Sequence, residues 1–308
     1  MAQLDDGGSI VNIAITGASG LIGRRLLKTL AAEGHALHAL SRRAGTNLPP
    51  GVRISVWDPL EGEPPAEALR EADAVIHLAG ENVAQRWTAE AKRRIRDSRV
   101  AGTRNLVHAL AKLERKPGVL ACASAVGYYG SRGDEMLTEA SAPGAGFLPD
   151  VCVAWEREAQ AAEALGIRVV RVRTGVALDA RGGAMKKLLP AFRMGAGGRL
   201  GNGRQWMPWI HLDDLAALFA FVLENPIAGP VNAVAPQPVT NAEFTRELAR
   251  TLHRPALFPV PGLALRLLLG EMSEVLLASQ RVAPQAAQAA GFRFKFPELG
   301  GALGDLLK

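Results

Sequence analysis

The chain has 308 residues, of which 48% are hydrophobic, and it carries a formal net charge of +6. This length fits one large domain or two small ones, and the apolar content is ample for a packed core. The two cysteines, Cys122 and Cys152, exclude a disulfide framework and lack the spacing of a metal site. We therefore predict a reduced, cytoplasmic protein without a bound metal.

Composition also limits the partners of the protein. The apolar segment 261–279 is interrupted by one arginine and two glutamates, which argues against a membrane span. The basic run 91–99 has no aromatic residues for base stacking, so a solvated helix face is favoured over nucleic-acid binding. The positive charge suits an anionic cofactor and substrate. We expect a small-molecule substrate and no membrane or nucleic-acid partner, and we keep a homodimer open.

The first element is predicted over residues 11–23, VNIAITGASGLIG. Its apolar start indicates a buried strand, and Gly17, Gly20 and Gly23 follow at a three-residue spacing. The first glycine permits a tight turn, the second lets the backbone approach a pyrophosphate, and the third lets the next helix pack closely. The free N–H groups at the start of that helix favour phosphates. We assign cofactor binding here to Gly17, Ser19, Gly20, Leu21, Ile22 and Gly23.

A second strand is predicted over residues 35–43, and it ends in Ser41, Arg42 and Arg43. In dinucleotide-binding folds an acidic residue at this point hydrogen-bonds the ribose 2′-hydroxyl, but this chain has none there. Cations and a hydroxyl suit a 2′-phosphate through charge-assisted hydrogen bonds. The pattern therefore favours NADP over NAD, and the alternative is a pair of solvated arginines after a strand.

Two further strands are predicted to complete the cofactor-binding surface. Residues 52–59 contain Asp58 near their end, where its carboxylate is suited to accept from an adenine amino group. Residues 73–80 end in small residues, which let the backbone lie against the cofactor. We expect Leu78, Ala79 and Gly80 to line the site.

The middle of the chain continues the alternation of strands and helices. We predict a helix over 88–111, a strand entering a loop over 118–130, a helix over 151–165 and a strand over 167–178. This order is typical of an α/β fold with a Rossmann-type, doubly wound parallel sheet. Ligands of such sheets bind at the carboxyl ends of the strands.

The pattern loosens after this alternation, where residues 179–205 are rich in glycine and arginine. We predict an NAD(P)-binding domain over residues 10–235, with 179–205 contributing to the substrate side. A small mixed C-terminal substrate lobe is predicted over residues 236–308. The adjacent Asp213 and Asp214 are interpreted as a helix cap rather than a metal site, because no further ligand cluster lies nearby.

Together these motifs resemble the extended short-chain dehydrogenase/reductase superfamily, through TGASGLIG at 16–23, DAVIHLAG at 73–80 and WIHLDDL at 209–215. More narrowly, SAVGYYG, WEREA and GNGRQWMPWIHLDDL are similar to the atypical "epimerase family", which is NAD-dependent epimerase/dehydratase-like and ends in a C-terminal domain of unknown function. The resemblance covers nearly the whole chain. It implies a Rossmann-type fold and NADP binding, and it implies no particular substrate.

The chain departs from this superfamily at the catalytic pair. The resemblance implies a Tyr and a Lys four residues apart on the helix after the fifth strand, with the Lys lowering the Tyr pKa. These positions fall on Cys152 and Glu156, which cannot do the same work. Ser124 matches the serine that holds the substrate oxygen, although another register places Ala125 there.

Three functions therefore stay open. The first is an NADP-dependent oxidoreductase with a replaced acid, for which Ser124, Tyr128 and Glu156 are the catalytic candidates and Tyr129 is a further proton donor. The second is an isomerase or dehydratase of the sugar-nucleotide epimerase type. The third is a non-catalytic NADP sensor or scaffold. Against catalytic roles, tyrosines at a strand end are often packing residues, and Glu156 is alternatively a surface or salt-bridged residue.

A substrate contact is predicted in the unusual segment 201–209. Its Arg204 is suited to carboxylates and phosphates, which arginine binds through two parallel hydrogen bonds. We expect a small polar or anionic substrate that contacts Arg204, Trp206 and Tyr129. The alternative is that the segment is a structural clasp between lobes.

Overall fold

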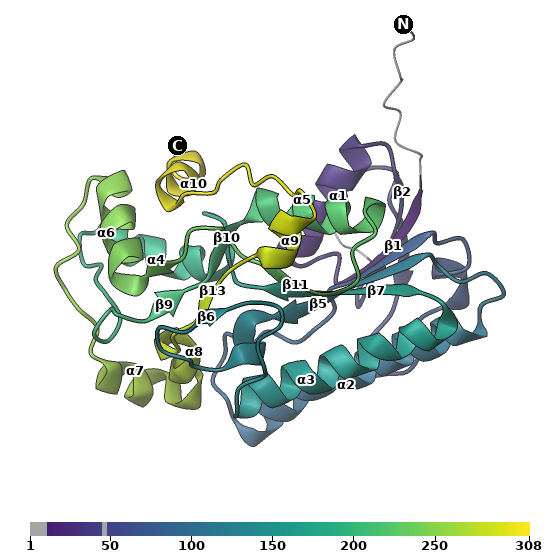
Figure 1. Cartoon of the computed structure of the whole chain (residues 1–308), viewed down its shortest axis with the longest axis horizontal. Coiled ribbons are helices and arrows are strands. Elements are labelled where there is room, and N and C mark those ends of the chain that lie inside the picture. Colours follow the sequence, from purple (N-terminus) through teal and green to yellow (C-terminus); the bar gives the residue numbers. More distant parts are fainter. Residues whose placement is uncertain (1–10, 45–47) are drawn as a thin grey trace, which may run out of the picture.

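The computed structural model describes residues 11–44 and 48–308, so the predicted domain boundary at residue 10 lies outside the described residues. Its centre is a parallel sheet of seven strands in the order β11-β7-β5-β4-β1-β2-β3 (Figure 1). The strands are β1 (Asn12–Thr16), β2 (Ala36–Ser41), β3 (Arg53–Val56), β4 (Ala74–His77), β5 (Val119–Ala125), β7 (Arg168–Thr174) and β11 (Gly229–Ala233). This order confirms the predicted Rossmann-type fold.

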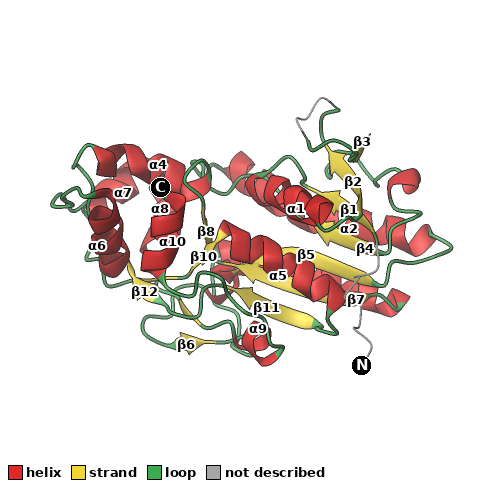
Figure 2. Cartoon of the chain, turned by 90° about the horizontal axis from the view of Figure 1, so that it is seen from above, coloured by secondary structure: helices red, strands yellow, loops and turns green. Residues whose placement is uncertain are grey.

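Helices cover both faces of the sheet (Figures 1 and 2). On one face lie α1 (Leu21–Ala32) and α5 (Leu212–Glu224), whose leucines join the sheet's valines and isoleucines in the largest core cluster. On the other lie α2 (Ala89–Lys112) and α3 (Phe147–Gln160). Helix α2 starts where the sequence predicts, because the Thr88 side chain accepts from the N–H of Ala91.

The predicted strand over 167–178 divides at Gly175. A Cβ at Gly175 would lie 2.7 Å from the carbonyl oxygen of Pro208, so the two segments can meet only at a glycine. Beyond this point β8 (Val176–Leu178) leaves the large sheet and pairs with β10 (Trp209–His211). The chain thereby passes from the sheet to the smaller lobe.

The smaller lobe is mostly helical and has its own core cluster. It contains α4 (Gly183–Arg193), β9 (Trp206–Met207), β12 (Val239–Thr240), α6 (Asn241–Leu252), α7 (Gly262–Leu269), α8 (Ser273–Leu277) and α10 (Leu299–Leu306). The short helices are η1 (Ala66–Ala68), η2 (Val126–Tyr129), η3 (Ala161–Leu165) and η4 (Gly270–Met272). Within the described residues, no helix is both long and apolar enough to cross a membrane.

Late residues return to the large sheet. Strand β13 (Arg281–Val282) pairs with β6 (Met136–Leu137), and α9 (Gln285–Ala289) packs on β11. Ala287 and Phe292 are buried in the largest core cluster, and the ring of Phe292 packs against Phe221 of α5. Part of the predicted 236–308 lobe therefore packs with the sheet.

The helix cap predicted at the aspartate pair is wrong. The Nδ1 atom of His211 accepts from the N–H of Asp213 at 3.1 Å, so His211 caps α5. The Asp214 carboxylate is buried and accepts from the N–H groups of Lys295 and Phe296. Asp214 therefore anchors the C-terminal segment to α5.

Candidate functional site

The turn between β1 and α1 is built around glycine. Gly17 has a φ of +68°, and a Cβ there would lie 2.7 Å from the carbonyl carbon of Leu78. A Cβ at Gly23 would lie 2.5 Å from the carbonyl oxygen of Gly17, so helix and turn pack without an intervening side chain. Gly20 is the N-cap of α1, and no side chain among the described residues caps it. The first N–H groups of α1 are thus left for another acceptor. Half-buried side chains beside the turn belong to Ser19, Leu21 and Ile22.

A buried hydrogen-bond network, missed by the motif-based predictions, holds the end of β4 against this turn. Thr16 Oγ1 lies 2.7 Å from His77 Nδ1 and accepts from the N–H groups of Leu78 (3.1 Å) and Ala79 (3.2 Å). His77 Nε2 lies 3.0 Å from Thr103 Oγ1. Burial lowers the pKa of His77 to about 3, so the ring is neutral at neutral pH. Thr16 and His77 are polar residues at the ends of the apolar strands β1 and β4, and this pattern could have predicted the network.

The end of β2 presents the residues predicted to select the cofactor. Ser41 is buried at the last position of β2, whereas Arg42 and Arg43 are exposed beyond it. Arg42 Nη1 lies 3.9 Å from Oε2 of Glu81, which follows β4. Asp58 Oδ1 accepts a backbone N–H two residues later at 3.0 Å, so this carboxylate also stabilises its own turn.

Gly80 packs directly against a guanidinium group. A Cβ at Gly80 would lie 3.1 Å from Cζ of Arg99. Arg99 Nη1 donates to the carbonyl oxygens of Glu81 (2.9 Å) and Ile95 (3.1 Å), and its Cζ lies 5.1 Å from the ring centroid of Trp155. Burial lowers the pKa of Arg99. Arg99 thereby supports the backbone just beyond β4 from the side of α2.

Cys152 and Glu156 stand at the positions of the superfamily's Tyr and Lys, and both are buried. Burial, with the nearby Glu156 charge, raises the pKa of the Cys152 thiol to about 12. Glu156 accepts from Nε and Nη2 of Arg173, each at 2.8 Å, and from Oγ of Ser124 at 2.7 Å. Burial opposes the Arg173 charge, but the hydrogen bonds and charge of Glu156 outweigh it and raise the pKa of Arg173. Glu156 is therefore salt-bridged, the alternative that the sequence left open.

Arg173 also contacts both tyrosines. Tyr129 is fully buried, donates to Oδ1 of Asn232 at 2.7 Å and accepts from Nη1 of Arg173 at 3.0 Å. Burial raises the pKa of Tyr129. Tyr128 is half-buried, with Cζ of Arg173 3.5 Å from its ring centroid. The structure thus gathers Ser124, Tyr128 and Glu156 around Arg173, and Tyr129 lies fully buried beside them.

Arg204 and Trp206 lie in a clasp between the lobes. Arg204 is exposed and lines a cavity of about 360 Å³ together with Asp134, Gln205 and Leu277. Trp206 Nε1 donates to Oδ1 of Asp134 at 2.7 Å. Gln205 Nε2 donates to the carbonyl oxygens of Leu200 and Leu276, at 3.0 and 3.3 Å. These hydrogen bonds fit the alternative that the segment is a structural clasp. Arg204 nevertheless faces a cavity.

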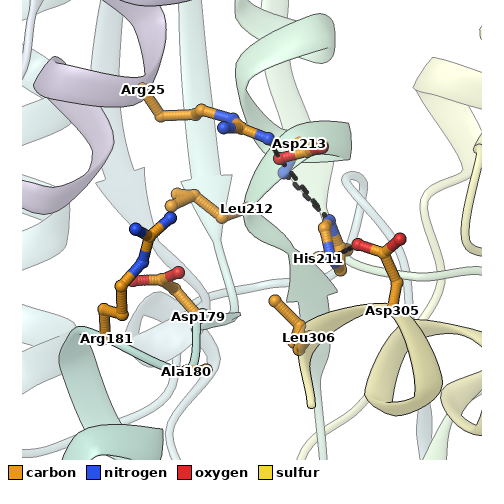
Figure 3. Close-up of a pocket in the computed structure, with 9 residues that line it drawn as sticks. All are labelled: Arg25, Asp179, Ala180, Arg181, His211, Leu212, Asp213, Asp305 and Leu306. Atoms are coloured by element: carbon orange, nitrogen blue, oxygen red, sulfur yellow. Dashed lines mark hydrogen bonds and ion pairs between the residues drawn. The ribbon is translucent and has the colours of Figure 1, made fainter. Parts of the chain in front are cut away.

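A second cavity, of about 160 Å³, lies between α1, α5 and α10 (Figure 3). Arg25 pairs with Asp213 across one side of it. His211 Nε2 is buried, has no hydrogen-bond partner among the described residues, and lies 3.6 Å from Oδ2 of Asp305. The described residues contain no group of three or more His, Cys, Asp or Glu placed to hold a metal ion.

Comparison with known families matches two parts of the chain. Residues 13–235 match the model of the NAD dependent epimerase/dehydratase family. Residues 260–306 match the domain of unknown function DUF1731. The first match alone covers more than half of the chain.

Individual relatives extend over nearly the whole length. Epimerase family protein Mb2239 of Mycobacterium bovis is 42% identical over 295 residues, which are 95% of this chain and 96% of that protein. The crystal structure of human epimerase family protein SDR39U1 (isoform2) with NADPH is similar with a TM-score of 0.85 and 34% identity, covering 96% of this chain and 98% of that one. A nucleoside-diphosphate sugar epimerase from Corynebacterium glutamicum gives a TM-score of 0.79 at 38% identity, covering 98% of this chain and 59% of that one.

Proposed function

Because the chain belongs to the NAD dependent epimerase/dehydratase family and ends in DUF1731, we propose that it binds NADP(H) at the β1–α1 turn. We further propose that it acts as an oxidoreductase on a small polar or anionic substrate. The observation that carries the proposal is the glycine turn, whose helix N-terminus has no side-chain cap among the described residues. The NADPH-bound human relative supports the same cofactor.

The turn suits a pyrophosphate for two physical reasons. The N–H groups at the start of α1 point out of the helix without a side-chain acceptor, and the helix dipole favours negative charge there. A Cβ at Gly17 or Gly23 would strike backbone atoms, so the turn keeps its close packing only with glycine at both positions. Leu78, Ala79 and Gly80 would contact the cofactor with backbone that Thr16 and Arg99 hold in place.

Selection of NADP over NAD would come from the end of β2. Arg42 and Arg43 are exposed, so both guanidinium groups can reach a 2′-phosphate, and Ser41 adds a hydroxyl. We expect the double variant R42Q/R43Q to weaken NADPH binding by about tenfold or more, because hydrogen bonds between charged groups are lost. NADH binding should stay unchanged, and R70Q, an exposed arginine elsewhere, serves as the control. Fluorescence titration measures both; equal losses for NADPH and NADH would contradict the assignment.

Catalysis would depend on Tyr128. A nicotinamide supplies hydride transfer, and the protein must then supply or accept a proton at the substrate oxygen. Tyr128 is the half-buried member of the cluster, and the Arg173 guanidinium packs on the face of its ring and holds the side chain in place. Ser124 is buried and donates to Glu156, so it would act by holding this carboxylate.

A non-catalytic NADP(H) sensor is the second candidate. It is favoured by the placement of Cys152 and Glu156, since the first is a buried neutral thiol and the second is locked to Arg173. Screening NADPH oxidation against small carbonyl compounds, keto acids and nucleoside-diphosphate sugars separates the two functions. An oxidoreductase should show turnover that Y128F reduces by about 100-fold or more while NADPH affinity is kept. NADPH binding with no turnover across these classes would favour the sensor.

A further inference from the structure

The smaller lobe carries an exposed apolar surface that the proposed function does not use. Six large hydrophobic side chains, each 63% to 76% exposed, belong to two neighbouring segments: Met194, Leu257, Phe258, Leu263, Leu267 and Leu268. The segments are joined where the N–H of Phe258 donates to the carbonyl oxygen of Gly197 and that of Val260 donates to Arg199. We call this surface the leucine face. Large apolar side chains left exposed on neighbouring segments of a folded protein indicate an interaction site.

Helix α7 presents most of this surface to the outside. Leu265 is buried against the protein, whereas Leu263 and Leu267, one helical turn apart, point away from it. Figure 1 shows α7 and the chain leading into it at the end of the molecule away from β1 and β2. The leucines therefore protrude, and they do not line a groove that would receive a partner's side chains.

The charged residues in the two segments of the leucine face are all basic. Residues 193–200 and 253–270 contain Arg193, Arg199, Arg254 and Arg266 but no aspartate or glutamate. All four arginines are exposed, and none forms an ion pair within the described part of the chain. The next carboxylates along the chain are Glu271 on η4, which pairs with Lys92, and Glu274 on α8, which is exposed. The surface is thus complementary to an extended negative charge.

We propose that the leucine face binds the surface of an anionic lipid bilayer. Protruding aliphatic side chains enter the boundary between headgroups and acyl chains, and neighbouring arginines contact lipid phosphates. A second copy fits poorly, because two such faces would bring like charges together. A protein partner fits less well, since the face has one aromatic residue and no Tyr or Trp, the usual anchors of protein interfaces. The proposed contact is peripheral and needs no membrane span, so it departs from the expectation of no membrane partner, which rested on the lack of a span.

Sedimentation of the full chain with vesicles tests the proposal. We expect binding to phosphatidylcholine vesicles that contain about one-third phosphatidylglycerol to be at least about tenfold tighter than to phosphatidylcholine alone, and to weaken with salt. L263S/L267S should reduce this affinity by about tenfold or more, and R199Q/R266Q should remove the preference for the anionic lipid. The matched controls L60S and R70Q change an exposed leucine and an exposed arginine outside the face and should bind normally.

Each other result overturns the proposal. Absence of binding to either vesicle, equal binding to both, or unchanged binding by L263S/L267S would exclude insertion of this face. Light scattering that shows a dimer lost in L263S/L267S would assign the face to a second copy. NADPH titration of the same variants is read separately, so failure here leaves the cofactor proposal untouched.

Discussion

Two regions at the carboxyl ends of the same parallel strands differ in how they satisfy their polar groups. The β1–α1 turn leaves helix N–H groups without a side-chain cap among the described residues. The cluster around Arg173 does the opposite, since Glu156 is held by three hydrogen bonds from Arg173 and Ser124. The first region is prepared for a ligand, and the second is largely complete by itself. A charged residue at the carboxyl ends of the strands is therefore not necessarily available to bind a ligand.

Breaking the Arg173 cluster should have the largest effect. In R173M, Glu156 would remain buried without its two hydrogen bonds from Arg173, and the more distant Arg171, 3.9 Å away, would not replace them. Loss of one partner of a buried pair costs about 3–5 kcal/mol. Urea unfolding measures the free energy of unfolding. The double variant R173M/E156L should recover part of the loss because it removes both charges of the Arg173–Glu156 pair. A loss under about 1 kcal/mol in R173M would mean that the pair is not buried as described.

The turn should respond to the presence of any side chain. G17V places a β-branched residue at positive φ, with its Cβ 2.7 Å from backbone, and should cost about 2–4 kcal/mol and abolish NADPH binding. Gly34 has a φ of +86° with no atom within 4 Å of an added Cβ, so G34A is the matched control. It should cost about 1 kcal/mol and leave NADPH affinity unchanged. Normal NADPH binding by G17V would remove the turn from the site.

At neutral pH the smallest effect is expected from the Cys152 thiol, which stands at the Tyr position. Burial raises the folded-state pKa of Cys152 from an ordinary value of 9.0 to about 12. The unfolded chain therefore loses this proton first, and the thiol contributes a stability decrease of up to about 1.4 kcal/mol per pH unit above pH 9.0. C152A should show a shallower decline than the native chain, measured by urea unfolding across this range. Identical slopes would mean that the thiol is accessible to water.

Local rules made much of the fold and the turn predictable. Glycine spacing is a backbone requirement, so Gly17 and Gly23 could be assigned before any contact was known. Thr88 could likewise be placed at the start of α2, because a cap acts only on the next few N–H groups. The parallel, doubly wound sheet followed from alternating strands and helices, whereas its strand order came only from the structure.

The cluster could not be predicted, because it depends on pairing between distant elements. Ser124 lies beside Arg173 only through the register of β5 on β7, and Glu156 reaches both from α3. The available signal was the pair of arginines, Arg171 and Arg173, within the apolar strand VVRVRT, since a buried cation requires a carboxylate partner. The cap of α5 was missed for a similar reason, because Asp214 turns to the N–H groups of Lys295 and Phe296.

The return of the last residues to the large sheet has a consequence for synthesis on the ribosome. Ala287 and Phe292 complete the hydrophobic cluster that also contains the first strand, so its first and last contributions come from near opposite ends of the polypeptide. During synthesis, apolar surface of this cluster therefore stays exposed until the last residues are made, and exposed apolar surface favours aggregation. A chain shortened before residue 287 would lack Ala287 and Phe292, the last residues to join the core cluster that begins with β1.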